Sequence, residues 1–133
     1  MNIQDHINSS RRNGTIDFTI DERCDDYVIS SMPVTEGVRN PFGTVQAGAL
    51  IWLADVTASV LAIGKREIGP DGEGFPLAVD LHTTLLSNQR EGIIRAEARF
   101  VQKGQTIMVI RTRITGDNDR VLAEVTSTHI RAV

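Results

Sequence analysis

The chain has 133 residues and carries 14 Lys and Arg against 17 Asp and Glu, which gives a formal net charge of −3 at pH 7. Apolar residues make up 41% and charged residues 23%, values that are typical of globular domains and argue against intrinsic disorder. The slightly acidic balance, without a Lys/Arg-rich run, argues against a nucleic-acid partner. At this length we expect one domain over residues 1–133, with 1–14 forming an N-terminal arm or short helix.

The N-terminal residues lack the charged-then-apolar layout of a secretory signal. The longest apolar-rich run, residues 49–63, contains an Asp and is shorter than the ~18 residues that a membrane span needs. Cys24 is the single cysteine, so no intramolecular disulfide and no CxxC motif can form, which fits a reducing compartment. We therefore expect a cytoplasmic protein with no membrane partner.

Hydrophobic periodicity divides the chain into one helix and several strands. The expected strands, in chain order, cover residues 15–20, 27–32, 77–85, 94–100, 106–115 and 121–130. Pro and Gly residues predict a loop over 33–46, and the segment from Ala47 to about Gly64 predicts a helix that is apolar nearly all round. Such a helix must be covered by other protein, so we expect an α+β domain with an antiparallel sheet wrapped around it.

Asp55 interrupts this apolar helix. An ionised carboxylate in apolar surroundings must be paired, hydrogen-bonded, protonated or directed into a cleft. One interpretation is structural, with Asp55 accepting hydrogen bonds from a neighbouring loop. The other is functional, because Gly48, Trp52 and Ser59 lie on the same helix face as Asp55 at spacings of three and four residues. By itself, a Trp at such a position is more often a core residue than a platform for a ligand.

The start of the helix has small residues at Ala47 and Gly48. The first backbone N–H groups of a helix have no intrahelical acceptor and lie at the positive end of its dipole, so they can bind a developing oxyanion. The side chains of Asn40 and Gln46 could add N–H donors to a carbonyl oxygen. An oxyanion site and a carboxylate are together the requirements of acyl transfer.

Gly48 and Asp55 are separated by roughly 10 Å along a helix, at ~1.5 Å per residue. This is too far for both groups to act on one carbonyl. Either a loop delivers other groups to Asp55 or a second chain supplies the helix N-terminus. We favour the second arrangement, a two-fold dimer with composite sites.

Residues 40–50 (Asn-Pro-Phe-Gly-Thr-Val-Gln-Ala-Gly-Ala-Leu) and 53–55 (Leu-Ala-Asp) resemble the signature of hotdog-fold acyl-CoA thioesterases. The resemblance is narrower to the phenylacetate-pathway and 4-hydroxybenzoyl-CoA types, and it extends from about Tyr27 to the C-terminus. It implies a hotdog fold, an acyl-CoA substrate, and self-association as a dimer that shares its sites. Many members of the family are homotetramers formed from two such dimers.

The resemblance also implies roles for individual residues. Asp55 would act as nucleophile or general base, the backbone of Ala47 and Gly48 would polarise the thioester carbonyl, and Asn40 would orient that carbonyl or a water molecule. Gln46 stands where the family has His, and Ala47 stands where it has the first Gly. The residues expected at the acyl group are Phe42, Trp52 and Ser59, and those expected at coenzyme A are Arg90, Lys103, Gly104 and Gln105. Phe42 and Trp52 could equally be core residues, and Arg90 and Lys103 could equally be solvated loop charges.

The three histidines, His6, His82 and His129, show no metal-ligand spacing, and we interpret them as structural or solvent-facing. No metal and no cofactor are expected beyond the coenzyme A of the substrate. The substitutions at Gln46 and Ala47 keep an alternative open, a non-catalytic hotdog protein that binds an acyl-CoA or an aromatic ligand. A hotdog hydratase or dehydratase is less favoured, because the histidine at the helix start is missing.

Overall fold

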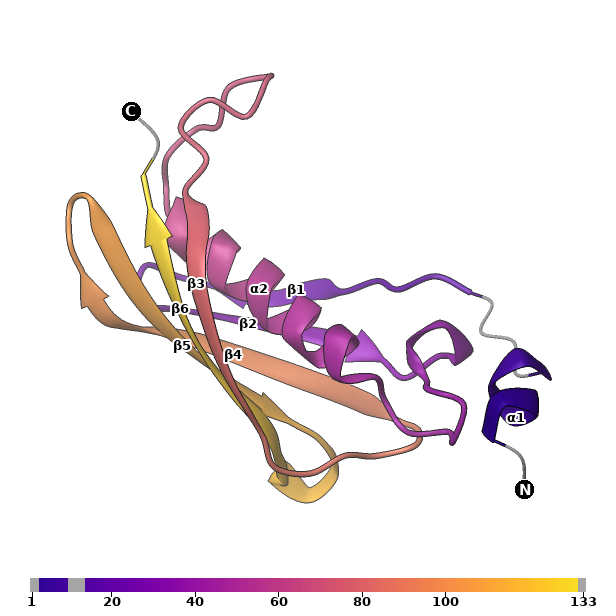
Figure 1. The fold of residues 1–133 in the computed structure, drawn as a ribbon. Coiled ribbons are helices and arrows are strands. Elements are labelled where there is room, and N and C mark those ends of the chain that lie inside the picture. The colour runs from indigo at the N-terminus through magenta and orange to yellow at the C-terminus, as the bar shows by residue number, and fades with distance from the viewer. Residues whose placement is uncertain (1–2, 10–13, 132–133) are drawn as a thin grey trace.

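The computed structural model describes residues 3–9 and 14–131 and shows one antiparallel sheet curved around a long helix (Figure 1). The strands are β1 (Thr19–Arg23), β2 (Tyr27–Pro33), β3 (Leu77–Leu85), β4 (Ile93–Lys103), β5 (Ile107–Thr115) and β6 (Val121–Ile130). They lie in the order β1-β2-β4-β5-β6-β3. The helices are α1 (Ile3–Ser9), the central α2 (Ala47–Ile63) and two short 3-10 turns, η1 (Glu36–Val38) and η2 (Asp117–Asp119). The predicted α+β fold, with a central helix over about 47–64, is confirmed.

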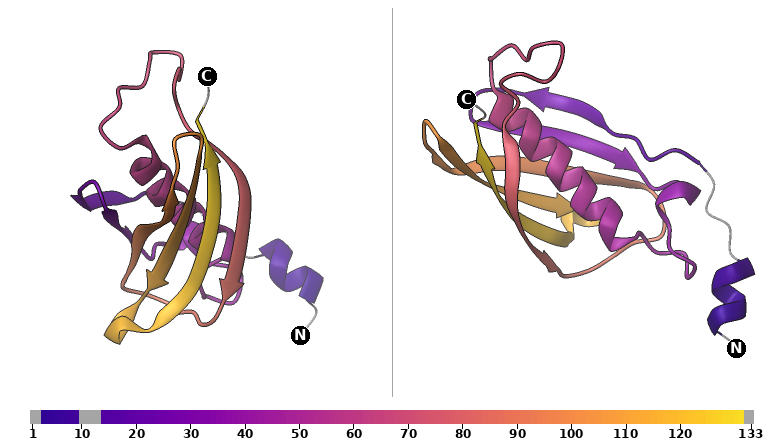
Figure 2. Two further views of the ribbon diagram at one scale, coloured as in Figure 1. Left: turned by 90° about the vertical axis from the view of Figure 1, so that its left-hand side faces the viewer. Right: turned by 45° about the horizontal axis from the view of Figure 1, so that its top comes forward.

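Helix α2 lies across the concave face of the sheet (Figure 2). In β5, fully buried residues alternate with half-buried or exposed ones, the period-two pattern of a strand that is covered on one face. The register sets the inward residues of neighbouring strands side by side, as for Ala98, Thr112 and Val125 on β4, β5 and β6. The core is therefore the layer between the sheet and one side of α2.

The described residues of the protomer cover one side of α2. The fully buried residues of the helix are Ala49, Leu50, Leu53, Ala54, Thr57, Ala58, Leu61 and Ala62. The opposite side is left half-buried and carries Ile51, Trp52, Asp55, Val56, Ser59, Val60 and Ile63. The helix stops at Gly64, which adopts a positive φ of 62°. The prediction that α2 is enclosed by protein therefore holds for one face of the helix in the protomer.

The two edge strands of the sheet differ in chemistry. Strand β1 has the sequence Thr-Ile-Asp-Glu-Arg, in which three of five residues are charged. Strand β3 is also exposed along its length, but Leu77, Val79, Leu81 and Leu85 are 58%, 56%, 43% and 52% exposed. Charged residues on an edge prevent further strand pairing, whereas a long apolar edge favours it. Strand β3 is therefore the edge that is suited to pairing with another strand.

The first strand differs from the expectation for residues 15–20. Pairing with β2 begins only at Thr19, which lies opposite Ser31. Residues 14–18 run past η1 instead, where the Thr35 hydroxyl donates to the Thr15 carbonyl over 3.2 Å. Alternation of apolar residues marked an extended segment here, but it could not show where a partner strand begins. Within the described residues, no helix is long and apolar enough to cross a membrane.

Candidate active site

The loop before α2 is shaped by the side chain of Asn40. Its Oδ1 accepts hydrogen bonds from the backbone N–H of Phe42 over 2.9 Å and of Thr44 over 3.2 Å. Its Nδ2 donates to the Thr44 hydroxyl over 2.7 Å. Such bonds are typical of Asn in tight turns. In this protomer Asn40 therefore holds the loop that leads to the helix start.

Asn88 holds the next part of the same loop and was not predicted from the sequence. Its Nδ2 donates to the Val45 carbonyl over 2.8 Å, and its Oδ1 accepts from the Val45 N–H over 3.1 Å. Gln46 follows as the N-cap residue, and its Nε2 donates to the Arg39 carbonyl over 3.2 Å. Asn88 lies 43 positions from Val45 in the sequence, and no local pattern indicates such a pairing.

The N-terminus of α2 is open to its surroundings. Ala47 and Gly48 are exposed, and no side chain of the described residues caps the helix. A Cβ atom added at Gly48 would meet no heavy atom of the described residues within 4 Å. The described part of the protomer therefore gives no packing reason for a glycine here. The free N–H groups and the positive end of the helix dipole make this a place where a partial negative charge is stabilised.

Asp55 and Ser59 lie on the uncovered face of α2, one helical turn apart. Both are half-buried, and neither side chain has a hydrogen bond or ion pair to any residue that the structure describes. The structural interpretation of Asp55, as an acceptor for a neighbouring loop, is thus not supported by the protomer. Its carboxylate is left available to a ligand or to a second chain.

The two aromatic residues proposed for the acyl group differ in their surroundings. The Trp52 and Phe18 rings form a T-shaped contact, with centroids 5.4 Å apart and an interplanar angle of 89°. This contact fixes the indole at the margin of the core while one side of α2 stays open. Phe42 is half exposed in the loop that precedes the helix.

The residues proposed for coenzyme A lie at opposite ends of α2. Arg90 donates to the Phe42 carbonyl over 2.7 Å, beside the helix start. Lys103, Gly104 and Gln105 form the β4–β5 hairpin, near the helix end. A Cβ on Gly104 would lie 2.5 Å from the Ile107 carbonyl oxygen, so the tight hairpin itself requires this glycine. The structure brings the hairpin residues together and separates them from Arg90.

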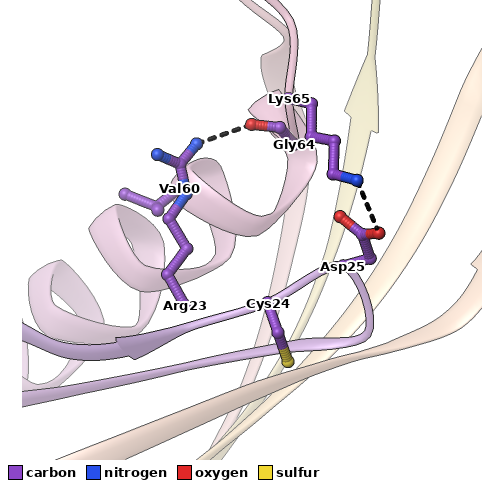
Figure 3. Close-up of a pocket in the computed structure, with 6 residues that line it drawn as sticks. All are labelled: Arg23, Cys24, Asp25, Val60, Gly64 and Lys65. Atoms are coloured by element: carbon purple, nitrogen blue, oxygen red, sulfur yellow. Dashed lines mark hydrogen bonds and ion pairs between the residues drawn. The ribbon is translucent and has the colours of Figure 1, made fainter.

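Basic residues gather at the C-terminal end of α2. A pocket of about 190 Å³ beside the hairpin is lined by four cationic side chains and one acid, which are Lys65, Arg66, Lys103, Arg131 and Asp25. A neighbouring pocket of about 400 Å³ is shown in Figure 3. There Arg23 donates to the Gly64 carbonyl over 2.6 Å, and Lys65 pairs with Asp25 over 3.2 Å. Cations are favoured at this end of a helix because its dipole is negative there.

Comparison with known proteins gives the fold its name. The chain has a TM-score of 0.80 to the thioesterase SAV0944 of Staphylococcus aureus, with 24% identity and coverage of 87% of this chain and 93% of that one. The chain has the hotdog fold. A hypothetical thioesterase of Streptococcus pneumoniae, solved with coenzyme A, has a TM-score of 0.76 at 18% identity and covers 87% of this chain and 86% of its own.

Sequence comparison finds a coenzyme A thioester hydrolase. A 1,4-dihydroxy-2-naphthoyl-CoA hydrolase of Listeria monocytogenes is 29% identical over 94 residues, which are 71% of this chain and 73% of that protein. No protein-family model matches the chain. The resemblance to hotdog-fold thioesterases that we predicted from residues 40–55 is confirmed by these relatives.

Proposed function

We propose that this hotdog protein is a thioester hydrolase that converts an acyl-CoA and water into a carboxylic acid and free coenzyme A. The enzyme class is supported by the named activities of the relatives. The observation that carries the proposal is Asp55, a carboxylate without a partner among the described residues, on the uncovered face of a helix that has no other charged residue. The reaction requires no metal and no cofactor other than the coenzyme A that the substrate brings.

The thioester carbonyl oxygen accepts hydrogen bonds from the free N–H groups of Ala47 and Gly48. These donors stabilise the negative charge that develops on this oxygen as the carbonyl is attacked. Asp55 either attacks the carbonyl carbon itself, which gives an anhydride that water then hydrolyses, or removes a proton from the attacking water. In both cases the thiolate of coenzyme A leaves and takes up a proton. Ser59 and Trp52 border the acyl group, and Phe42 lies at the mouth of the site.

The two halves of this site come from two protomers in our proposal. Asp55 and the helix start of one protomer are separated by roughly 10 Å along α2 at ~1.5 Å per residue, so they cannot act on the same carbonyl. The apolar edge of β3 supports a dimer in which two β3 strands pair across a two-fold axis. Such a dimer also covers the open faces of both α2 helices. Pairing of two such dimers gives the homotetramer that the resemblance implies.

The nucleotide part of coenzyme A binds at the basic pocket beside the β4–β5 hairpin. Its phosphate groups meet Lys103 there, together with Arg66 and Arg131, none of which forms an ion pair with an acid in the described part of the chain. Gly104 and Gln105 shape and extend this hairpin. Arg90 contributes by holding the loop at Phe42. The pneumococcal relative with bound coenzyme A supports a ligand of this class.

A thiol-release assay tests the proposal directly. Purified protein is incubated with short-, medium- and long-chain acyl-CoAs and with phenylacetyl-, hydroxybenzoyl- and 1,4-dihydroxy-2-naphthoyl-CoA, the last because the Listeria relative is named for it. We expect saturable release of free thiol from at least one class.

Saturable binding of these compounds without thiol release would instead identify a non-catalytic acyl-CoA-binding protein. The engagement of the Asn40 side chain with its own loop favours this second candidate. In that case Gln46→His and Ala47→Gly, which introduce the residues that the family has at these positions, would be the first variants to assay for thiol release.

A further inference from the structure

The face of the sheet that points away from α2 carries a basic pocket. The pocket has a volume of about 420 Å³ and lies over β4 and β5, where its lining residues are Glu97, Arg99, Phe100, Val101, Arg111 and Arg113. Burial alternates along both strands, with Ala98 and Thr112 buried, so the arginines between the buried positions point outward. The sheet therefore separates this pocket from α2 and from the site that we propose for the reaction.

Two of the arginines face each other across the strands. Arg99 on β4 lies directly opposite Arg111 on β5 in the register of the sheet. Like charges at opposed positions repel and destabilise a strand pair. The chain as a whole has a net charge of −3, so a general excess of cations does not account for this arrangement. An anion bound between the two guanidinium groups would remove the repulsion.

The acidic residues of this face are paired with other arginines. Glu97 pairs with Arg99, and Glu124 on β6 pairs with Arg113, each over 3.2 Å. The Arg111 side chain is exposed and forms no ion pair or hydrogen bond with any residue that the structure describes. Its guanidinium, which carries five N–H donors, is therefore available to a ligand.

A β-bulge lies at the same pocket. The register of β4 against β5 shifts between Phe100 and Gln102, which leaves Val101 as the extra residue. A bulge bends its strand and changes the direction of side chains, and bulges are frequent beside binding sites. Val101 is 53% exposed and lines the pocket together with the arginines. The pocket thus combines an apolar surface with a cluster of cationic groups.

The geometry of the donors selects the anion. A planar carboxylate matches the fork of a single guanidinium, and Glu97 already fills that role for Arg99. A tetrahedral phosphate presents oxygens in several directions, so it can accept hydrogen bonds from guanidinium groups on two strands at once. A phosphate group also carries up to two negative charges, which suits two opposed arginines.

We propose that this pocket binds a small organic phosphate. Arg111 is the principal ligand of the phosphate group, Arg99 donates from the opposite strand, and Val101 contacts the carbon part of the molecule. The site is independent of the proposed function, because it lies on the other face of the sheet from Asp55 and from the basic pocket at Lys103.

Binding is measured by NMR at the pocket itself. The Nε–H resonances of Arg99 and Arg111 are followed while the full chain is titrated with inorganic phosphate and, separately, with phenyl phosphate. We expect saturable shifts of both resonances and severalfold tighter binding of phenyl phosphate, because its ring is placed against Val101. Absence of saturation with both compounds would overturn the proposal. Equal affinities for the two compounds would contradict an organic phosphate as the ligand.

Arg111→Gln is the decisive variant, with the Arg99 resonance as its reporter. We expect its affinity for phenyl phosphate to fall at least tenfold. Arg95→Gln removes the same charge from an exposed position of β4 outside this pocket and should change the affinity less than twofold. Lys103→Gln, on the other face, should likewise leave it unchanged. Equal losses in Arg111→Gln and Arg95→Gln would indicate a general effect of positive charge and would contradict a defined site.

The stability and mass of Arg111→Gln test the alternatives to a ligand site. Without phosphate we expect a Tm equal to or above that of the wild type, because the repulsion with Arg99 is removed. A lower Tm would show that Arg111 stabilises the sheet and would contradict the proposal. Analytical ultracentrifugation should give the same mass for both proteins. A smaller mass for Arg111→Gln, without phosphate binding in the wild type, would identify the face as a contact between copies of the chain instead.

Discussion

The side chain of Asn88 holds the backbone of Val45 through two hydrogen bonds, one to its carbonyl over 2.8 Å and one from its N–H over 3.1 Å. This contact fixes the chain immediately before the N-cap of α2. A loop 43 positions away thereby sets the direction of the N–H groups that our proposal assigns to the thioester carbonyl.

We predict that Asn88→Ala lowers both stability and activity. The substitution leaves two backbone groups of Val45 without their partner, which costs about 1–3 kcal/mol. The expected result is a lower Tm together with a larger fall in kcat than in substrate affinity, because the donors lose their alignment. Gln102→Ala, which shortens an exposed amide side chain on β4, is the control. Unchanged turnover in a folded Asn88→Ala variant would show that the contact between Asn88 and Val45 does not contribute to catalysis.

Gly48→Ala separates stability from function at the helix start. The new methyl meets nothing within 4 Å in the protomer, and replacing a helical glycine by alanine gains about 0.5–1 kcal/mol. We expect equal or higher Tm and a fall in kcat/KM of about tenfold or more, equivalent to about 1.4 kcal/mol, because the methyl occupies space that substrate and partner chain need. A more stable variant with full activity would show that the carbonyl is bound elsewhere.

Val79→Lys tests the dimer edge. A charge on the exposed apolar face of β3 disfavours pairing of two such strands. We expect analytical ultracentrifugation to show monomers, with thiol release reduced by orders of magnitude because each site lacks half of its groups. Thr19→Lys places the same charge on the other edge, β1, and should change neither mass nor rate. An active Val79→Lys monomer would refute the composite site.

Lys103→Gln tests the phosphate contact through a choice of substrates. An acyl-CoA carries the nucleotide phosphates, whereas the matching N-acetylcysteamine thioester has the same reacting bond and no phosphate. We predict a raised KM for the acyl-CoA and no change for the short thioester. An equal rise in KM for both substrates would contradict the phosphate contact and would indicate that Lys103 supports the hairpin structure instead.

Much of the fold follows from local patterns in the sequence. The apolar run from Ala47 that ends at Gly64 and the turn at Gly116–Asp119 correspond to α2 and to the β5–β6 connection. The predicted start of β1 was wrong. A strand begins where hydrogen bonding to its partner begins, and the alternation of apolar residues carries no information about the partner. The prediction that protein encloses α2 is confirmed for one face of the helix.

The candidate site shows the same division between local and distant information. Asp55 could be identified from the sequence, because burying a charge among apolar residues costs free energy and the pattern lies within one helix. Asn88 could not be identified from the sequence, because its importance comes from its contacts with Val45. A single Asn in a loop has the same local context whether or not the fold brings it to a site.

The turnover of Asp55→Asn on the best substrate of the acyl-CoA panel tests the central claim most directly. The amide keeps the size of the side chain but can neither attack the thioester nor accept a proton from water, so we predict a loss of thiol release by orders of magnitude with an unchanged Tm. Asp71→Asn, which removes an exposed carboxylate from the loop after α2 and is assayed beside it, should retain the wild-type rate. A folded Asp55→Asn that hydrolyses acyl-CoA at the wild-type rate would contradict the role of this carboxylate and the mechanism built on it.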